Sequence, residues 1–540
     1  MTDGKAAVRA TVFGHLAGMV MAPVVKALWE RRALELFKGP GNWIELDRIV
    51  EHTHGNRGYL RVALRMLASH GWLIQREDNQ NSPSYTLTTE GAIALEFAPR
   101  LYGEVVPFLS MAIFLEDFLF GNSQGSVLPW FQVLVPRAKE RWISGRDAGS
   151  GKIYDQIRAH ADGVLVGPAM AALERGGIFK QLREGPVEMK NVPANPIYTP
   201  WMFDLLATQG WITLDRDRLR LTQSGLYAAN IATAYGVTVS YLPLLAVIGT
   251  LLFGNARVPR VDDSGVELFV NRAMNVWGSG GAHKTYFNKL EEIIKDIFSR
   301  PLEAQPKGIC DMGCGDGTLL EHVYSVVKNQ TPRGKVLDAQ PLIVVGADIN
   351  KVARRLSTQR LRRAKIPSFH VISGNISRPA QLANDLEKLE LDIHELLHVR
   401  SFLDHNRPYA PPADYVRGQR NPRTTGAFAY LGEEIPADEM EENLVRHLRR
   451  WAPYTGRFGL LVLELHTLPP EVTALNLDKT PAVAYDATHG FSDQYLVELP
   501  VFLELAREAG LVAEPRYQAK FPPSDLATIS INYFSAGLQP

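Results

Sequence analysis

The sequence predicts an α/β protein in which a mainly helical N-terminal part precedes a Rossmann-like core of parallel strands. Residues 308–318, GICDMGCGDGT, read as a buried strand that turns through glycines into a helix. Two more apolar strands, at 341–350 and 368–375, each end on a polar residue. The N-terminal half contains one pattern twice, around 62–75 and around 201–214. Together these observations place the core in the second half of the chain.

The length of 540 residues is enough for three or four units of roughly 150 residues each. We expect domains at 1–130, 131–258 and 259–540. The apolar fraction of 46% and charged fraction of 21% are typical of globular proteins. The 58 basic and 58 acidic residues balance, so no global field favours nucleic acid.

The most apolar stretch is 236–254, which Pro243 and glycines interrupt. We therefore predict a buried helix there and no membrane span. The N-terminus has no basic segment leading into an apolar one, which makes a cytoplasmic location the expectation. The two cysteines, Cys310 and Cys314, indicate neither a disulfide framework nor a zinc cluster.

Each repeat begins with an amphipathic helix that closes on Gly-Trp and passes into a strand. A second strand follows, then a T-x-x-G segment, at 85–94 and at 219–229, and an apolar helix that ends in LFGN. This order is typical of a winged helix, so we predict two winged-helix-like units. A DNA-reading unit needs Lys and Arg on its recognition helix. The first candidate helix, 55–67, has three arginines, but the second, 195–206, has no basic residue. We therefore expect a scaffold, a dimerisation surface or an active-site lid, and no nucleic acid partner.

The glycine-rich turn predicts a nucleotide-type cofactor site formed by Asp311, Gly313, Gly315 and Gly317. An acidic residue before the turn suits the cationic amino-acid end of S-adenosylmethionine better than a pyrophosphate, which makes an NAD-type site the main rival. Asp348, at the end of the second strand, is placed to accept hydrogen bonds from ribose hydroxyls. Asn375, at the end of the third, could meet the adenine edge. Each residue could instead be a helix N-cap, but three matched strand ends favour a class I methyltransferase core.

Further polar residues follow the next strands of the predicted sheet. His398 and Arg400 lie on the fourth strand, and the polar residues of the loop after it are Asp404, His405, Asn406, Arg407 and Tyr409. The apolar run LVLELH ends on His466, and His489, Asp493 and Gln494 come later. A single histidine is more often structural. As a group at one sheet edge, these side chains suit either a divalent metal or an acid/base site.

Four motifs carry a resemblance that extends over nearly the whole chain: GSGGAHKTYF (278–287), DMGCGDGT, VRSFLDHNRPY and HGFSDQYLVE. The chain resembles the C-methyltransferases of polyketide synthase loading modules, such as those of the apratoxin, gephyronic acid and saxitoxin pathways. The resemblance implies a mononuclear iron or manganese ion beside S-adenosylmethionine, held by His466 and Gln494, with His489 as the alternative ligand. It also implies a cofactor contact at Gly281.

The function implied is methylation of the α-carbon of a malonyl or methylmalonyl group on an acyl carrier protein, with the metal stabilising the enolate. A neighbouring decarboxylase-like domain of the same megasynthase is an expected partner. Arg400 and Arg407 are candidates for holding the malonyl carboxylate or the phosphopantetheine phosphate, and a surface ion pair is the alternative role for them. The alternative enzyme is a metal-free O-methyltransferase with His405 or His489 as general base. A third reading is a winged-helix binding protein with a degenerate catalytic domain, which the intact Asp311, glycines and Asp348 oppose.

Overall fold

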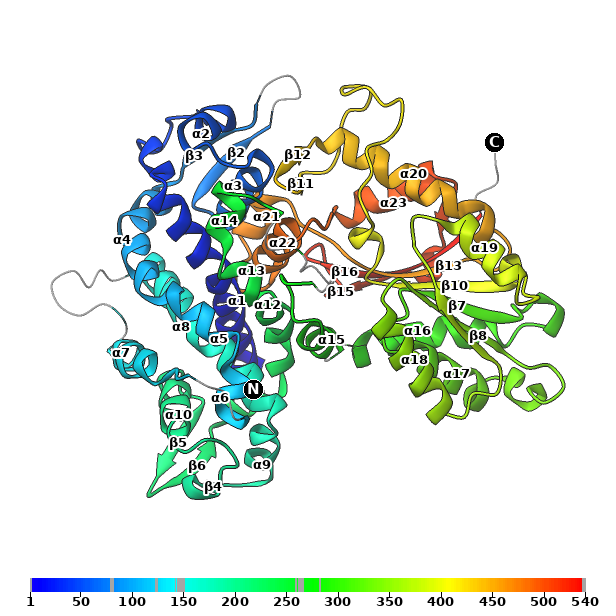
Figure 1. The fold of residues 1–540 in the computed structure, drawn as a ribbon, viewed down its shortest axis with the longest axis horizontal. Coiled ribbons are helices and arrows are strands. Elements are labelled where there is room, and N and C mark those ends of the chain that lie inside the picture. The colour runs from blue at the N-terminus through cyan, green and yellow to red at the C-terminus, as the bar shows by residue number, and fades with distance from the viewer. Residues whose placement is uncertain are drawn as a thin grey trace. The chain divides into compact units, whose positions relative to one another are not determined.

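The computed structural model describes residues 2–77, 82–121, 125–140, 142, 151–257, 260, 267–280 and 283–536. The chain forms two compact units, whose elements are labelled in Figure 1. The first unit comprises Met1–His283, Ala427–Glu434 and Pro469–Asp493, and the second comprises Lys284–Gly426, Ile435–Leu468 and Gln494–Pro540.

These units differ from the predicted domains, because both winged-helix-like regions belong to one unit and two later segments join them. The later segments contribute apolar side chains to the first core, among them Ala429, Val483, Ala487 and Phe491. Helix α22 (Ala482–Phe491) packs against α3 (Arg57–Ser69), although the two are far apart in the sequence. The sequence alone therefore did not predict this contact.

The second unit is built on an eight-stranded sheet in the order β14-β16-β13-β10-β7-β8-β9, with β15 also paired to β16. The strands are β7 (Gly308–Met312), β8 (Ile343–Asp348), β9 (Phe369–Ser373), β10 (Leu396–Ser401), β13 (Leu460–Leu465), β14 (Leu511–Ala513), β15 (Ala519–Phe521) and β16 (Ile529–Ala536). Strands β7 to β10 and β13 are parallel, whereas β16 runs antiparallel to β13 and to β14. The chain moves outward from β7 to β9 and returns on the other side of β7, so the strand order reverses between β7 and β10. The predicted Rossmann-like core is confirmed.

Helices cover both faces of this sheet, which gives three layers. One face packs against α16 (His283–Ile297), α17 (Thr318–Gln330) and α18 (Lys351–Arg363). The other packs against α19 (Pro379–Glu387) and α20 (Ala437–Thr455), with Trp451 fully buried. A further helix, α23 (Leu499–Glu508), contacts α20. Successive residues of β7 alternate between the two apolar layers, Ile309 to one and Cys310 to the other, as the strand pleat requires.

The first unit contains two small sheets with the same strand order. In the first copy β1 (Ile44–Glu45) precedes helices α2 (Leu46–Thr53) and α3, and β2 (Leu73–Arg76) and β3 (Ser84–Leu87) follow them, in the sheet order β1-β3-β2. In the second copy β4 (Val187–Glu188), β5 (Ile212–Asp215) and β6 (Arg218–Leu221) form the order β4-β6-β5 around α9 (Ile178–Glu184) and α10 (Thr199–Thr208). The structure thus repeats the winged-helix arrangement that the sequence predicts.

The T-x-x-G segments explain why each copy keeps this pattern. Thr88 and Thr222 cap helices α4 (Thr89–Val105) and α11 (Gln223–Asn230), each accepting from the backbone N–H of the glycine three residues on. A Cβ on Gly91 would lie 1.9 Å from the Trp72 carbonyl oxygen, and one on Gly225 would lie 1.7 Å from that of Trp211. Only glycine lets each helix approach the Gly-Trp corner this closely.

The long helices α1 (Thr2–Glu30) and α8 (Lys152–Arg175) pack together at the centre of the first unit. Its other described helices are α5 (Leu109–Ala112), α6 (Leu115–Phe120), α7 (Leu128–Lys139), α12 (Gly236–Ser240), α13 (Leu242–Leu245), α14 (Ile248–Phe253), α15 (Arg272–Gly280) and α21 (Pro470–Ala474). Two further strands are β11 (Phe428–Tyr430) and β12 (Glu433–Ile435).

The prediction of a single buried helix at 236–254 is wrong, because this stretch breaks into α12, α13 and α14 around Pro243 and its glycines.

Within the described part of the chain, one helix is long and apolar enough by length and composition to cross a membrane, at Gly4–Glu30, and 78% of its most apolar window is buried inside the protein. The sequence reading placed the most apolar stretch elsewhere, at 236–254. Burial of this kind is what a central helix of a globular core requires.

Candidate active site

The glycine turn after β7 has the backbone that its sequence predicts. Gly313, Gly315 and Gly317 have φ angles of 82°, 52° and 83°, in the left-handed region that favours glycine. The Gly313 N–H donates to the Ala347 carbonyl at 2.7 Å, which fixes the turn against β8. Helix α17 then begins at Thr318, directly after the last glycine.

Two carboxylates flank this turn at the ends of β7 and β8. Asp311 is 1% exposed, and its Oδ1 has no hydrogen-bond partner among the described residues. Burial, together with the nearby charge of Asp348, raises the pKa of Asp311 well above its ordinary value. Asp348 accepts hydrogen bonds from the backbone N–H of Gly315 at 3.1 Å and of Asn350 at 2.7 Å.

An arginine absent from the sequence prediction braces the turn. Arg360 of α18 donates to the Asp316 carboxylate at 2.6 Å, to the Asp316 carbonyl at 3.1 Å and to Glu321 of α17 at 3.0 Å. The side chain of Asp316 in turn accepts from the N–H and hydroxyl of Thr318. Asp316 is part of the glycine-rich motif, but its partner Arg360 lies 44 residues away. No local sequence pattern predicts that Arg360 would contact it.

Two further residues, Asn375 and Gly281, were predicted to contact the cofactor. Asn375 is half-buried beyond β9, and its Oδ1 accepts from the Ser377 N–H at 2.9 Å, which is a local turn. This is close to the capping role considered for it, so its contact with adenine stays a prediction. Gly281 lies outside the described residues.

The residues around the turn fit S-adenosylmethionine. A Cβ on Gly315 would meet no atom within 4 Å, so the turn has open space beside it. The buried Asp311 oxygen that lacks a partner is suited to a cationic ligand. The site lies at the carboxyl ends of β7 and β8, next to the point where the strand order reverses, as the ligand sites of open α/β sheets do. Asp311, the three glycines and Asp348 would hold the cofactor.

An imidazole and a carboxylate form a buried pair at the ends of β10 and β13. The Nδ1 of His405 lies 2.5 Å from Oε1 of Glu464. Glu464 also accepts from the backbone N–H groups of Asp404 at 2.8 Å, His405 at 3.2 Å and Leu465 at 2.7 Å. His405 was predicted as a catalytic residue, but Glu464 was missed. An acidic residue inside the apolar run LVLELH was the available signal.

The loop that carries His405 is fixed by a second buried cluster. Arg400 donates to Asp404 at 2.6 Å and stacks on Trp451, while His447 lies 2.9 Å from the same carboxylate oxygen. Burial alone would raise the pKa of Asp404, but the Arg400 charge and the His447 hydrogen bond outweigh it and hold that pKa well below its ordinary value. Burial lowers the pKa of His447 to about 4, so this imidazole is neutral near pH 7.

The two arginines proposed to hold an anionic substrate group are structural. Arg400 is 1% exposed in the cluster above. Arg407 is 3% exposed and donates to Asn443 at 2.8 Å and to the Asp404 carbonyl at 2.9 Å. Both guanidinium groups therefore stabilise the loop. Arg400 does so through a buried ion pair with Asp404, and Arg407 through hydrogen bonds, so neither forms the surface ion pair that was the alternative role.

His466 has a complete set of protein partners. Its Nδ1 lies 3.3 Å from the Val497 carbonyl and its Nε2 lies 2.7 Å from the Ser530 hydroxyl, which also accepts from Asn532 at 2.8 Å. The consistent arrangement has Nδ1–H donating to Val497 and the Ser530 hydroxyl donating to Nε2. Burial lowers the pKa of His466 to about 4, so the ring is neutral.

The predicted metal ligands do not fit a metal centre. Both ring nitrogens of His466 are engaged by the protein, and no group of three or more His, Cys, Asp and Glu in the described part of the chain could hold a metal ion. Gln494 is buried, and so is His489, the alternative ligand and second candidate base. The Nδ1 of His489 is 2.7 Å from the Tyr485 carbonyl one helical turn earlier. The iron or manganese prediction thus gains no support from these residues.

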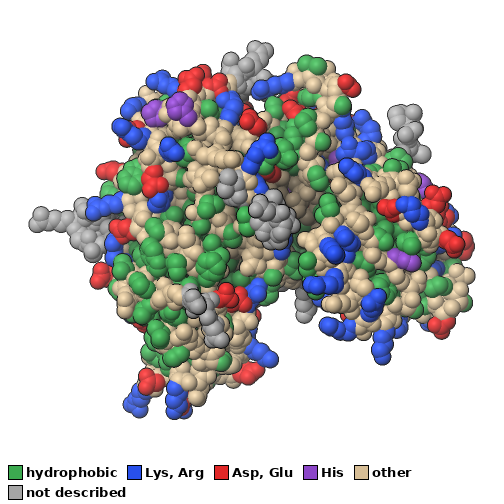
Figure 2. Space-filling model, viewed as in Figure 1, with side chains coloured by type: hydrophobic (Ala, Val, Ile, Leu, Met, Phe, Trp, Pro, Cys, Tyr) green, Lys and Arg blue, Asp and Glu red, His purple; other side chains and the backbone are tan. Residues whose placement is uncertain are grey.

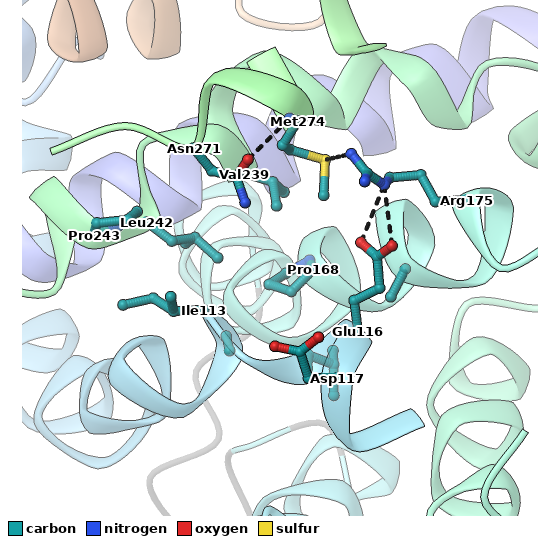
Figure 3. Close-up of a pocket in the computed structure, with 13 residues that line it drawn as sticks. Ile113, Glu116, Asp117, Pro168, Arg175, Val239, Leu242, Pro243, Asn271 and Met274 are labelled. Carbon is teal, nitrogen blue, oxygen red and sulfur yellow. Dashed lines mark hydrogen bonds and ion pairs between the residues drawn. The ribbon is translucent and has the colours of Figure 1, made fainter. Parts of the chain in front are cut away.

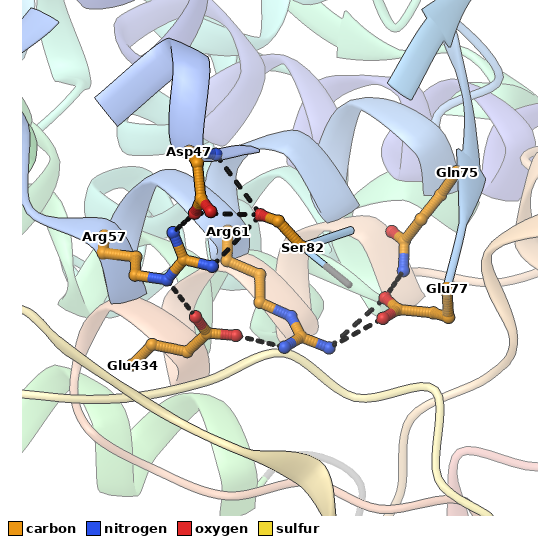
Figure 4. A network of polar contacts seen from close by, with 7 residues as sticks. All are labelled: Asp47, Arg57, Arg61, Gln75, Glu77, Ser82 and Glu434. Carbon is orange, nitrogen blue, oxygen red and sulfur yellow. Dashed lines mark hydrogen bonds and ion pairs between the residues drawn. The ribbon is translucent and has the colours of Figure 1, made fainter. Parts of the chain in front are cut away.

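The arginines of the first candidate recognition helix are paired within the first unit. On α3, Arg57 contacts Asp47 and Glu434, and Arg61 contacts Glu434 and Glu77 (Figure 4). Arg65, on the same helix, contacts Asp486 at 2.6 Å. Arg61 and Arg65 are buried. A DNA-reading helix directs such groups to phosphates, so these contacts favour a packing role for α3.

The first unit also contains a cavity of about 200 Å³ beside α6, α8 and α15 (Figure 3). Two contacts join groups of its lining: Arg175 lies 3.0 Å from Glu116, and Asn271 accepts from the Met274 N–H at 3.0 Å. This cavity therefore has neither the glycine turn nor the imidazole–carboxylate pair of the second unit.

The strand order and the glycine turn between two carboxylates are those of a class I S-adenosylmethionine-dependent methyltransferase. Family models match three parts of the chain: the AprA MT2-like domain at residues 267–532, the AprA N-terminal domain at 8–75 and the AprA winged helix domain at 162–255. These regions cover most of the sequence, and the chain belongs to the AprA-like methyltransferase family. The resemblance drawn from the four motifs is confirmed at the level of the family.

Similar solved structures include the mitomycin 7-O-methyltransferase MmcR, with 13% identity, a TM-score of 0.43 and coverage of 71% of this chain and 97% of that one. An O-methyltransferase family protein from Burkholderia thailandensis has 14% identity and a TM-score of 0.41, covering 72% and 100%. Human N-acetylserotonin methyltransferase in complex with S-adenosylmethionine has 13% identity and a TM-score of 0.38, covering 73% and 100%. No curated protein matches the sequence.

Proposed function

We propose that this methyltransferase methylates the α-carbon of a malonyl-type thioester carried by an acyl carrier protein, with His405 as the general base. The membership in the AprA-like family supports the substrate class. The His405–Glu464 pair is the observation that carries the chemistry, because α-carbon methylation begins with removal of a proton from carbon.

The pair is organised for proton removal. Glu464 accepts from Nδ1–H of His405, which leaves the lone pair of the imidazole on Nε2. Three backbone N–H groups fix the carboxylate, so the ring keeps one orientation. When the imidazole gains a proton, the adjacent negative charge stabilises the resulting cation. No step of this proposal uses a metal ion.

The cofactor half of the site contributes orientation. S-adenosylmethionine supplies an electrophilic methyl group when it is bound. The glycine turn, Asp311 and Asp348 bind the cofactor next to β7, and His405 lies beyond the neighbouring strand β10. Binding of both reactants at one sheet edge replaces a bimolecular encounter with an oriented one.

The test is the position of the new methyl group. Wild-type protein is incubated with S-adenosylmethionine and a malonyl-loaded carrier protein, and the acyl group is analysed by mass spectrometry and NMR. We expect a methyl group on the α-carbon. Transfer to an oxygen, or turnover only of free hydroxyl compounds, would support the O-methyltransferase alternative and overturn this proposal. A His405→Gln variant should lose the transfer while still binding the cofactor.

A further inference from the structure

The segment that follows β8 concentrates positive charge. Residues 349–365 contain seven Lys or Arg and no Asp or Glu, in a chain whose basic and acidic residues balance. The seven are Lys351, Arg354, Arg355, Arg360, Arg362, Arg363 and Lys365. Most of them lie on α18. The protein as a whole offers no such excess, so this charge is a local feature.

Two of the seven have internal roles. Arg360 braces the glycine turn, and Arg354 donates to the carbonyl groups of Asp348 and Ile349, both at 2.8 Å. The other five are exposed and form no ion pair with any described residue. Cations without an internal counter-ion are available to an external partner.

The exposed side of α18 has two adjacent rows. Lys351, Arg355 and Arg362 share one line of the helix at spacings of four and seven residues. Beside them Val352 is 54% exposed and Leu356 is 43% exposed, and Ile349, just before the helix, is 66% exposed. Ser357 and Leu361 on the opposite side are buried. We call these six exposed residues, Lys351, Arg355, Arg362, Ile349, Val352 and Leu356, the α18 face. Figure 2 shows Lys and Arg side chains gathered over this part of the second unit.

The α18 face begins at the edge of the sheet where the cofactor site lies. Helix α18 starts three residues after Asp348, and the Arg354 contacts hold its first turn against the end of β8. A partner bound here would therefore sit beside the site rather than over a remote part of the sheet.

We propose that the α18 face docks an acidic surface of the acyl carrier protein that brings the substrate. This inference rests on the proposed function, and it names the surface that the carrier would contact. A basic row next to an apolar row complements a helix with carboxylates beside apolar residues. The exposed apolar row is poorly matched to a nucleic acid backbone, which is contacted through charge and hydrogen bonds alone.

The test compares two variants with the same change of charge. The first carries Lys351→Glu, Arg355→Glu and Arg362→Glu. The control carries Lys328→Glu, Lys335→Glu and Lys520→Glu, at exposed positions of the same unit away from α18. Each is assayed with malonyl-loaded carrier protein and with malonyl-pantetheine, which has no protein part. Binding of the unloaded holo carrier protein is measured separately by calorimetry.

We expect the α18 variant to raise KM for the carrier-bound substrate about tenfold or more, and to lose the salt dependence of that KM. Its kcat, its cofactor affinity and its turnover of malonyl-pantetheine should match those of the control. Equal KM values for both variants with the carrier-bound substrate would overturn the docking site. So would binding of DNA or anionic vesicles, but not of carrier protein, through the α18 face.

The two proposals fail in different ways. If wild-type protein methylates neither malonyl substrate, the proposed function is wrong, and the calorimetric comparison still decides the docking site. If wild-type protein methylates both substrates and the α18 variant binds carrier protein normally, only the docking site is wrong.

Discussion

Glu464 accepts a hydrogen bond from Nδ1 of His405 across the neighbouring parallel strands β13 and β10, with 2.5 Å between the two atoms. Both side chains are buried, 59 residues apart in sequence. The register that pairs Ser401 with Leu463 brings the loop after β10 to the end of β13. The contact fixes the orientation and the tautomer of the His405 imidazole, which is the proposed base.

Replacing Glu464 by Gln should lower kcat by about 10²–10³-fold, because the amide cannot stabilise a protonated imidazole. Affinity for S-adenosylmethionine should stay within about twofold of wild type. Steady-state kinetics and calorimetry measure the two quantities. The matched control is Glu504→Gln, an exposed carboxylate on α23 that pairs with Arg423. A Glu464→Gln enzyme with wild-type kcat would remove the pair from the mechanism.

The Asp348→Ala variant should bind S-adenosylmethionine more weakly by about 1.5–3 kcal/mol, since a charged acceptor is lost. The N–H groups of Gly315 and Asn350 also lose their partner, so a small drop in melting temperature is expected. Asp385→Asn, on the surface of α19, is the control. Unaltered affinity with a native melting profile would contradict the assignment of Asp348 to the cofactor site.

Binding of S-adenosylmethionine should become tighter as the pH rises through the raised pKa of Asp311. The unliganded carboxyl keeps its proton above its ordinary pKa because it is buried beside Asp348, whereas a bound cation favours the charged form. Binding then releases a proton, and the affinity increases with pH. Calorimetry in two buffers of different ionisation enthalpy measures this release. Asp311→Asn should abolish it, and a wild-type protein that releases no proton would refute the explanation.

His466→Gln should change the stability and its pH dependence, and leave the metal content unchanged. The folded pKa of His466 is about 4 and the unfolded value is about 6.5, so the unfolded state binds more protons between these values. The stability that neutral His466 contributes is present above pH 6.5 and is lost as the pH falls towards 4, by about 3 kcal/mol in total.

Chemical denaturation at several pH values should therefore show a shallower loss in the variant than in wild type. Elemental analysis of the two proteins is the companion measurement. Stoichiometric iron or manganese in wild type that disappears in His466→Gln would restore the metal-ligand reading.

Gly91→Ala should destabilise the first unit by several kcal/mol, because the new Cβ would overlap the Trp72 carbonyl. Gly225→Ala should be destabilising for the same reason, because its Cβ would overlap the Trp211 carbonyl. Gly103→Ala on the same helix as Gly91 is the control, since its Cβ meets no atom within 4 Å and alanine favours a helix by about 1 kcal/mol. Thermal unfolding that ranks the three variants equally would show that the close approach is unimportant.

Features that depend on neighbouring residues could be predicted from the sequence by itself. The positive φ angles of Gly313, Gly315 and Gly317 follow from a tight strand-to-helix turn, which only glycine permits at low strain. The repeated Gly-Trp and T-x-x-G segments specify the same corner twice, because a threonine cap and a glycine contact are built from neighbouring residues. The buried strands and their parallel order were likewise predictable from short apolar runs that alternate with helices.

Tertiary structure alone decided the partners of the polar residues. LVLELH offered two polar side chains, and the sequence reading took His466 as functional and passed over Glu464. Because β13 pairs with β16, the Ser530 hydroxyl contacts His466, whose role is therefore structural. Because β13 also pairs with β10, Glu464 contacts His405. A hydrogen bond forms only when donor and acceptor lie within about 3 Å of each other. Residues that are far apart in the sequence reach this distance only once the register of the sheet is set. A pattern along the sequence therefore shows which residues can do chemistry, and the register of the sheet decides which of them come into contact.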